Sequence, residues 1–322
     1  MDNSIVERIN SFFDFNKMYN DIQKLNIVAW NGAISMSQVD LWLDNFTGEF
    51  LGDSQAEKNL ALNMLRNYTY YTDREIKHFC KVIYELYIHS KIADYNSSKK
   101  HEGLTDAQKE AEAVKNTKFI SLGIPSESGS LILYWFRDAN LLPKTVFQLD
   151  DDIPENLVVL DDVSISGSQA VRYLKKIKNI QERKVYFLCF LCTDEAEKNI
   201  KKQYPDITII VASKIHSFCK AFSDDSVFFS ADTDEYKAIT KNLFEHYGNK
   251  VVQEYPTPED AYMSKYPLGY GDAQQMFSFF YNTPNNTLPL IWIENAGWNP
   301  LFKRTEKIYS PEIEVKNDER FL

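Results

Sequence analysis

A run of thirteen residues, Leu157 to Gln169, constrains the fold of this chain more than any other segment. It reads Leu-Val-Val-Leu, then two adjacent aspartates, then a short serine-rich loop with one glycine. The four apolar residues are too few for a helix and are bounded by polar residues, so they predict a buried strand of a parallel sheet. Asp161 and Asp162 then lie at the carboxyl end of that strand, where open α/β sheets bind ligands.

The loop after the two aspartates leads into a helix, because positions 170, 171, 174 and 177 are apolar at helical spacing. Backbone N–H groups and hydroxyls at the start of a helix form a phosphate site. Two carboxylates beside that site repel phosphate unless they face ribose hydroxyls or a metal. The segment therefore predicts a ligand with both ribose and phosphate. The alternative is an ordinary acidic turn in which Ser164 or Ser166 only caps the helix.

A second loop of this kind lies upstream. Residues 118–122 predict a short strand and residues 131–137 a helix, and the loop between them is rich in serine and glycine. Such residues let the backbone approach a ligand closely. The alternative is a plain helix cap at Ser126 and Ser128, and Glu127 is unfavourable next to an anion unless it ligates a metal or caps its own helix.

Strands and helices alternate through the middle of the chain, which predicts a parallel sheet with right-handed crossovers. The expected strands are 119–122, 145–149, 157–160, 184–192 and 207–212, and the expected helices lie near 130–139, 168–178 and 194–203. Upstream, helices are expected at 9–25, 39–43 and 60–64 and after the capping box at 72–75. We therefore expect an α/β fold with a helical region, 1–115, and an α/β domain, 116–322, whose residues from about 213 form a C-terminal hood.

The predicted hood is rich in Asn, Thr, Pro and Trp. In a functional interpretation, Tyr281 or Trp292 stacks on a base and Asn285 or Asn286 reads the edge of that base. In the alternative, these side chains satisfy turn backbones in a rigid closing loop. Both alternatives stay open because loops cover folds and also carry sites.

Charge and composition exclude several classes of function. The formal net charge of −10 argues against nonspecific nucleic-acid binding, which depends on Lys and Arg to neutralise phosphates. No apolar run is long enough to cross a bilayer and no secretory signal is visible, so a cytoplasmic protein without membrane contact is expected. Cys189 and Cys192 lie in an apolar strand and are expected to be buried, unreactive thiols.

The acidic strand end and its loop resemble the phosphoribosyl pyrophosphate loop of type I phosphoribosyltransferases. This resemblance implies that Asp161 and Asp162 hold the ribose 2′- and 3′-hydroxyls, directly or through Mg²⁺, as the catalytic and metal-binding pair. It implies a 5′-phosphate contact for the turn, formed by Ser164, Ser166, Gly167, Ser168 and Gln169. Ile165 and Gln169 depart from the small or hydroxyl residues usual there. The upstream loop would bind pyrophosphate through Ser126, Glu127, Ser128 and Gly129.

Most of the chain resembles the phosphoribosyltransferase-like proteins of bacterial conflict and antiviral defence cassettes, including some retron operons. The resemblance rests on the two loops together with Gly-Tyr-Gly-Asp-Ala-Gln at 269–274 and Asn-Thr-Pro-Asn-Asn-Thr-Leu-Pro at 282–289. It implies an effector or accessory protein that acts with partner proteins of such a cassette and binds phosphoribosyl pyrophosphate or a nucleotide.

Three function classes follow from these features. The first is a glycosyltransferase of the phosphoribosyltransferase type, in which breaking the C1–O bond develops oxocarbenium character on the ribose and negative charge on the leaving group. The second is a nucleotide or nucleic-acid N-glycosidase that uses the same site. The third is a catalytically inactive nucleotide sensor, which the departures at Ile165 and Gln169 would permit.

Overall fold

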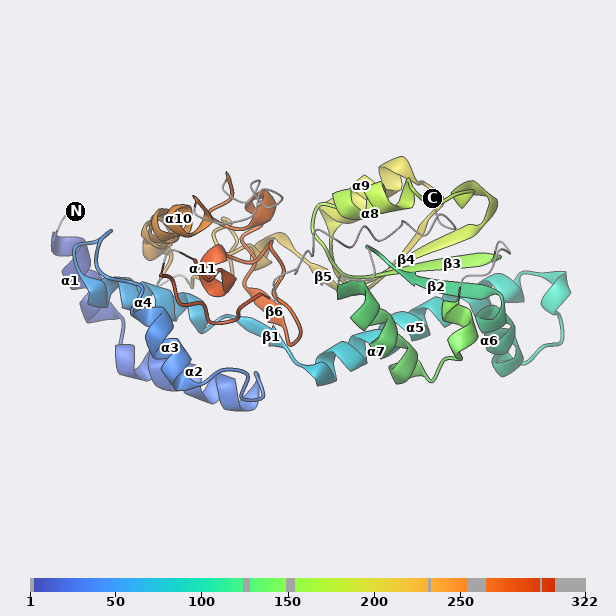
Figure 1. The fold of residues 1–322 in the computed structure, drawn as a ribbon, viewed down its shortest axis with the longest axis horizontal. Coiled ribbons are helices and arrows are strands. Elements are labelled where there is room, and N and C mark those ends of the chain that lie inside the picture. The colour runs from blue at the N-terminus through green and yellow to red at the C-terminus, as the bar shows by residue number, and fades with distance from the viewer. Residues whose placement is uncertain are drawn as a thin grey trace, which may run out of the picture. The chain divides into compact units, whose positions relative to one another are not determined.

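The computed structural model describes residues 3–123, 128–148, 154–230, 233–253, 265–295 and 297–304. The chain divides into two compact units (Figure 1). Of the described residues, unit 1 joins those up to Asp73 with those from His216 to Arg304, and unit 2 contains Arg74–Ile215. The segment from 216 to 304 shares its core with the N-terminal helices, so the units differ from the predicted division into 1–115 and 116–322.

Unit 2 is built on a four-stranded sheet in which all neighbouring strands are parallel, in the order β2-β3-β4-β5. The strands are β2 (Thr117–Ser121), β3 (Asn156–Ser164), β4 (Lys184–Thr193) and β5 (Thr208–Ile215). The helices are α5 (Asp73–Asn96), α6 (Asp106–Lys115), α7 (Ser128–Asn140), α8 (Ser168–Leu174) and α9 (Asp194–Gln203). Continuous apolar runs form β3 and β4 because both faces of this sheet are covered. The predicted α/β fold with a parallel sheet is confirmed.

Helices cover both faces of this sheet. α8 and α9 pack on the face that carries Val159 and Phe187, whereas α5 and α7 lie on the other face (Figure 1). There, the Tyr87 ring of α5 lies 4.9 Å from the Tyr186 ring, and the Phe136 ring of α7 lies 5.3 Å from Phe119. The helix after β2 and the helix after β3 therefore leave the sheet on opposite sides. In open α/β sheets this arrangement creates a crevice at the carboxyl ends of the two strands.

No strand forms over 145–148, which is the described part of the strand predicted at 145–149. Residues Lys144–Phe147 form a 3₁₀ turn, η2, which begins after Pro143. Its apolar side chains cover the outer edge of β2: the Phe147 ring stacks on Phe119 at 5.5 Å, and Lys118 Nζ donates to the Thr145 carbonyl at 2.9 Å. A covered edge strand is protected from pairing with other chains, which explains why an apolar run is present without a strand.

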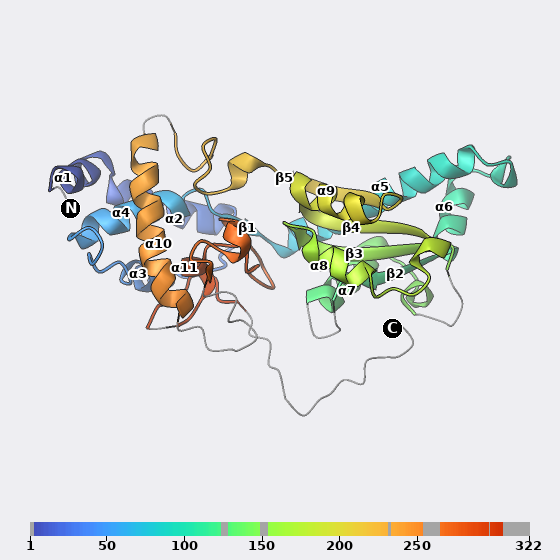
Figure 2. The ribbon, with the colours of Figure 1, turned by 90° about the horizontal axis from the view of Figure 1, so that it is seen from above.

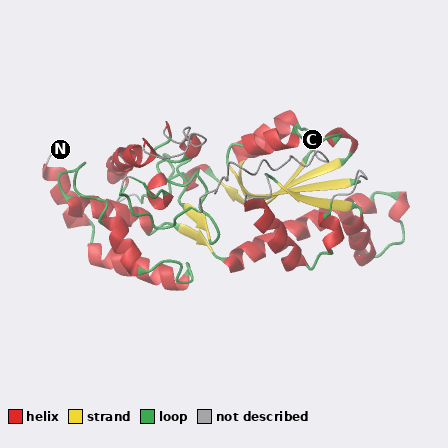
Figure 3. Cartoon of the chain, in the orientation of Figure 1, coloured by secondary structure: helices red, strands yellow, loops and turns green. Residues whose placement is uncertain are grey.

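Unit 1 is mainly helical and contains one short parallel strand pair, β1 (Thr69–Tyr71) with β6 (Phe277–Phe279). Its helices are α1 (Asn3–Phe12), α2 (Phe15–Val28), α3 (Met36–Leu43), α4 (Ser54–Leu65), α10 (Lys237–Gln253) and the short α11 (Pro289–Trp292). α10 packs against α4 and α11 (Figure 2; helices are red in Figure 3). The single helix predicted at 9–25 is interrupted because Asp14 caps α2 by accepting from the Lys17 amide at 3.0 Å.

The core of unit 1 holds the aromatic residues that the sequence pattern assigns to packing. Trp30 and Trp42 have 1% and 0% of their surface exposed. Trp42 Nε1 donates to the Leu290 carbonyl at 2.7 Å and so ties α3 to α11. Among the helices that the structure describes, none combines the length and apolar character needed to span a bilayer.

Candidate functional site

The two aspartates lie in β3 just past the end of its neighbour β2. Ser121, the last residue of β2, pairs with Leu160, so Asp161 is the first residue of β3 beyond that edge. Only 7% of Asp161 and 8% of Asp162 is exposed. Asp161 Oδ1 accepts from the Asp162 amide at 3.0 Å, and Asp162 Oδ1 accepts from the Val163 amide at 2.8 Å. β3 thus carries two adjacent carboxylates just beyond the end of β2, where the crevice between these two strands opens.

The loop after the aspartates is compact. Ser164 is buried, whereas Ser168 and Gln169 are exposed at the start of α8. Ser166 Oγ donates to Ser168 Oγ at 3.1 Å. The Ser168 amide approaches Ser166 Oγ at 3.4 Å, which is a long contact for a helix cap. The hydroxyls and the backbone of this turn therefore lie together, as a phosphate site needs.

Gly167 has the left-handed backbone conformation, with φ of 72°. A Cβ atom here would lie 2.7 Å from the Ala196 carbonyl oxygen of α9. The close approach that requires glycine is therefore an approach to α9. The sequence alone suggested only an approach to phosphate.

We expect Gly167→Val to lower the unfolding free energy by at least about 2 kcal/mol, because strain in the left-handed region adds to a clash with backbone. Thermal unfolding of the variant measures this loss. Gly103→Val is the matched control: Gly103 has a φ of 82°, and a Cβ atom added there would meet no other atom within 4 Å, so it carries the strain without the clash. Equal losses in the two variants would contradict a role for the α9 contact.

The first residue after β2 is hydrogen-bonded to β3 directly before the acidic pair. The Leu122 amide donates to the Leu160 carbonyl at 2.8 Å, directly before Asp161. A Cβ atom on Gly129 would lie 2.6 Å from Ser121 Cβ, so this glycine lets α7 start tightly against β2. Ser126 and Glu127 lie outside the described residues, and for Ser128 only the backbone is described. Their predicted contact with pyrophosphate stays a prediction.

The basic residues Arg137, Lys214 and His216 lie in different parts of the fold, and the contacts of the first two are with residues outside the acidic pair and its loop. Lys214 of β5 forms ion pairs with Asp194 and Glu197 in the first turn of α9. Burial opposes the charge of Lys214, but these two carboxylates outweigh it and raise the pKa of the ammonium group. Arg137 stacks over the Tyr134 ring at 5.6 Å. His216 is the first residue of unit 1 after β5.

The predicted base-reading residues lie in unit 1. Trp292 is only 2% exposed and its Nε1 donates to the Thr287 carbonyl at 3.0 Å, so the prediction that its ring stacks on a base is wrong. Asn286 Nδ2 donates to the Tyr270 carbonyl at 3.1 Å. That bond ties the 282–289 segment to the 269–274 loop, as expected of a rigid closing loop. A role for Asn286 in reading a base stays a prediction.

The sequence interpretation missed the role of α9. Thr193 Oγ1 donates to the Ile165 carbonyl at 2.5 Å, and Asn199 Nδ2 donates to the Ser166 carbonyl at 2.7 Å. The only local signal was Thr193, a helix-capping residue type, whose Oγ1 also accepts from the Ala196 amide at 3.0 Å.

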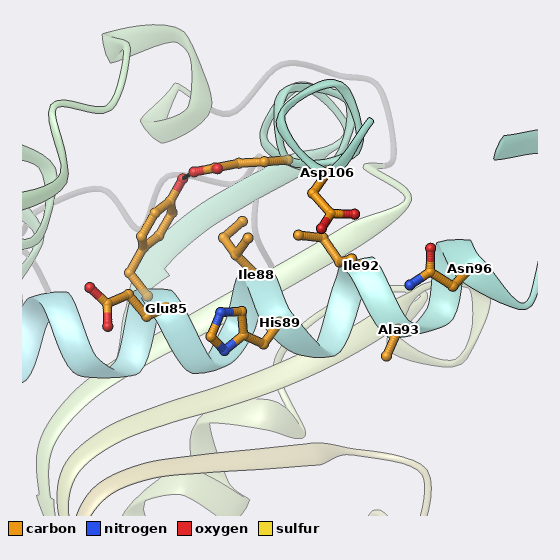
Figure 4. Close-up of a pocket in the computed structure, with 9 residues that line it drawn as sticks. Glu85, Ile88, His89, Ile92, Ala93, Asn96 and Asp106 are labelled. Carbon is orange, nitrogen blue, oxygen red and sulfur yellow. Dashed lines mark hydrogen bonds between the residues drawn. The ribbon is translucent and has the colours of Figure 1, made fainter. Parts of the chain in front are cut away.

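A shallow groove of about 460 Å³ lies between α5 and α6 and contains none of the predicted site residues (Figure 4). Tyr84 and Glu110, which line it, are joined by a hydrogen bond of 2.9 Å from Tyr84 Oη to Glu110 Oε1. Burial, with this carboxylate, raises the pKa of Tyr84. Its hydroxyl therefore stays protonated and serves to join α5 to α6.

Cys189 and Cys192 are fully buried, which confirms the predicted burial of these thiols. Burial raises the pKa of Cys189 well above its usual range and that of Cys192 to about 12. Cys80 is also fully buried, with a pKa raised to about 12, whereas Cys219 is half-buried.

We expect iodoacetamide at pH 8 to modify Cys219 in the native protein while the other three thiols react only after unfolding, since the thiolate is the nucleophile. Mass spectrometry before and after addition of urea tests this, and native modification of Cys189 would contradict it.

Comparison with known proteins adds two findings. The model of the PRTase-CE family matches residues 39–304, which is most of the chain. Uracil phosphoribosyltransferase from Rhizobium meliloti (strain 1021) is 35% identical over 68 residues, which cover 21% of this chain and 32% of that protein. The uracil phosphoribosyltransferase of Acidovorax sp. (strain JS42) is 26% identical over 81 residues, which cover 24% of this chain and 39% of that protein. The chain thus spans about a third of the length of these curated relatives.

Proposed function

Because this chain belongs to the PRTase-CE family, a phosphoribosyltransferase-like family, we propose that it binds a ribose 5-phosphate donor at the carboxyl end of β3. The donor is phosphoribosyl pyrophosphate or a nucleotide, and the reaction is glycosyl transfer of the phosphoribosyltransferase type. The local similarity to uracil phosphoribosyltransferases supports this donor class. One observation carries the proposal: a buried acidic pair followed by a Ser-Gly-Ser turn, at the point where the helices leave the sheet on opposite sides.

In this proposal, Asp161 and Asp162 receive the ribose hydroxyls and the turn from Ser164 to Gln169 receives the 5′-phosphate. Pyrophosphate lies between the end of β2 and the start of α7, where Gly129 allows α7 to pack closely against Ser121. The two carboxylates therefore face the sugar, where positive charge develops as the C1–O bond breaks. Backbone N–H groups of the two loops hold the anionic ends of the donor.

The acidic pair also fits Mg²⁺. Its donors are carboxylate oxygens, which are the ligands that Mg²⁺ prefers. Within the described part of the chain, no group of three or more His, Cys, Asp or Glu side chains could hold a metal ion. Two carboxylates suit an ion that completes its shell with water and substrate phosphates. Bound Mg²⁺ would supply charge stabilisation to the leaving pyrophosphate.

We further propose that the protein acts in bacterial antiphage defence, with partner proteins of its cassette. This role rests on the likeness of the 269–274 and 282–289 segments to defence-associated relatives. The two segments are in contact, since the Tyr270 amide donates to the Asn285 carbonyl at 2.8 Å. Phage plaque assays on cells with the whole cassette test the role, with Asp161→Asn/Asp162→Asn in place of the wild-type chain. Equal plaque numbers on cells with the wild-type chain and on cells with the double variant would contradict the defence role.

Calorimetry tests the donor site. We expect the wild-type protein to bind phosphoribosyl pyrophosphate with MgCl₂, and to bind it at least about tenfold more weakly with EDTA, because a lost metal removes contacts to both carboxylate and phosphate.

Product analysis with nucleobases then detects transfer, and release of a free base from a nucleotide would indicate an N-glycosidase instead. Binding without turnover would favour a sensor. The exposed Gln169, in place of a small or hydroxyl residue, is consistent with that outcome. Failure to bind any ribose phosphate would overturn the proposal.

A further inference from the structure

We propose that α9 holds the phosphate loop in its binding conformation, and that Thr193 and Asn199 are positioning residues for the 5′-phosphate of the ligand. This inference rests on the proposed function, because it assigns a means of ligand binding to the same loop. It adds residues that lie 28 to 33 positions away from the loop in sequence.

Three consecutive residues of the loop contact α9. The Ile165 carbonyl accepts from Thr193 Oγ1 at 2.5 Å, at the residue that caps α9. The Ser166 carbonyl accepts from Asn199 Nδ2 at 2.7 Å, more than a turn further along the helix. Gly167 comes next, and a Cβ atom there would lie 2.7 Å from the Ala196 carbonyl. The loop backbone is therefore held against one face of a ten-residue helix.

These contacts fix the direction of the loop amides. In a trans peptide the C=O and the following N–H point in opposite directions. The structure has no cis peptide bond among the described residues. Because the carbonyls of Ile165 and Ser166 point toward α9, the N–H groups of Ser166 and Gly167 point away from it. Two successive N–H groups on one side of a turn form a concave anion site.

α9 itself is anchored to the sheet. Thr193 is the last residue of β4 and pairs with Ile215 of β5. Lys214, next to it, forms ion pairs with Asp194 and Glu197 of the first helical turn. Ala196 and Ile200 are fully buried against the sheet. The two donors to the loop therefore start from a rigid element, which is what a preorganised site needs.

The test compares single substitutions on α9. Asn199→Ala removes one donor to the loop, and Thr193→Val removes the other. Thr193→Ser keeps the hydroxyl, and Lys198→Ala is the control at an exposed neighbouring position. Calorimetry uses ribose 5-phosphate as the probe for the loop, and pyrophosphate with Mg²⁺ as the probe for the site's other end. Hydrogen exchange measures the loop amides in the peptide that covers 161–170.

We expect Asn199→Ala to bind ribose 5-phosphate about fivefold more weakly, which is the effect of one hydrogen bond, and to exchange its loop amides faster. Thr193→Val should weaken binding at least as much, while Thr193→Ser and Lys198→Ala stay near wild type. Pyrophosphate affinity should not change in any variant. Unchanged loop exchange and unchanged ribose 5-phosphate affinity in both Asn199→Ala and Thr193→Val would overturn the inference, as would an equal loss for both probes.

Hydrogen exchange separates this inference from the proposed function. If the wild-type protein binds no ribose phosphate, the proposed function fails, yet faster exchange in Asn199→Ala still supports the control of the loop by α9. Unchanged exchange overturns that control whatever the ligand is.

Discussion

Asp161→Asn combined with Asp162→Asn is expected to lower the affinity for phosphoribosyl pyrophosphate at least about 100-fold while the fold stays intact. A hydrogen bond to a charged group contributes about 1.5–3 kcal/mol, so two lost carboxylates account for about two to four factors of ten. Asparagine keeps an oxygen in place of each Oδ1, which accepts from the amides of Asp162 and Val163. The amides of β3 therefore keep their acceptors. Calorimetry then measures the affinity that is lost when the two negative charges are removed.

The matched control removes two carboxylates elsewhere in unit 2. Glu182→Gln with Asp206→Asn makes the same change of charge at exposed positions outside the acidic pair and its loop. We expect wild-type affinity in this control and an unchanged melting temperature in both proteins. If the Asp161 and Asp162 variant binds as tightly as wild type, the ribose is held elsewhere. If it unfolds, the pair supports the fold.

The sheet of unit 2 was predictable because its strands can be recognised from short segments of the sequence. β3 and β4 are continuous apolar runs of a length that suits a strand. The acidic pair was predictable for a related reason, since two carboxylates directly after such a run break a pattern that packing alone would continue. The prediction of a strand at 145–149 failed because the sequence does not distinguish an apolar residue that covers the edge of a sheet from one that lies in a strand of the sheet. Phe147 covers Phe119 from a 3₁₀ turn.

Features that depend on distant contacts could not be predicted. The apolar run around Trp292 indicates burial, but it does not show that the core is shared with the N-terminal helices. Asn199 is an exposed polar residue on a helix, and its bond to the Ser166 carbonyl joins segments 33 residues apart. The assignment of 216–304 to the same unit as the N-terminal helices likewise depends on packing between opposite ends of the chain.

Glu57→Ala is expected to destabilise unit 1 by about 3–5 kcal/mol, because it leaves several buried donors without an acceptor. Glu57 is fully buried. Its carboxylate accepts from the amides of Gly48, Phe50 and Leu51, each at 2.8 Å. It also accepts from Tyr247 Oη at 2.7 Å, which joins α4 to α10. Burial, with Glu57 adding to it, raises the pKa of Tyr247 to about 12, so this hydroxyl donates at any pH in common use.

The size of this loss follows from the four donors that alanine leaves without an acceptor. Each unsatisfied buried donor costs about 1–3 kcal/mol, less whatever water can recover. Tyr247→Phe removes one donor to Glu57 and the acceptor of the Thr47 amide at 3.2 Å, but leaves the three amides paired with the carboxylate, so we expect a smaller loss of about 1–2 kcal/mol. Lys58→Ala is the control at the adjacent residue, whose ion pair with Asp44 at 2.8 Å is partly exposed and contributes little.

Urea unfolding followed by tryptophan fluorescence measures these losses in the right unit, because Trp30, Trp42, Trp292 and Trp298 all lie in unit 1 and only Trp135 lies in unit 2. Ligand affinity at the β3 site reports unit 2 separately. We expect Glu57→Ala to shift the fluorescence midpoint far more than either comparison variant. A shift no larger than that of Lys58→Ala would mean that the loop at 47–51 has other acceptors, and that Glu57 contributes little to joining α4 with α10.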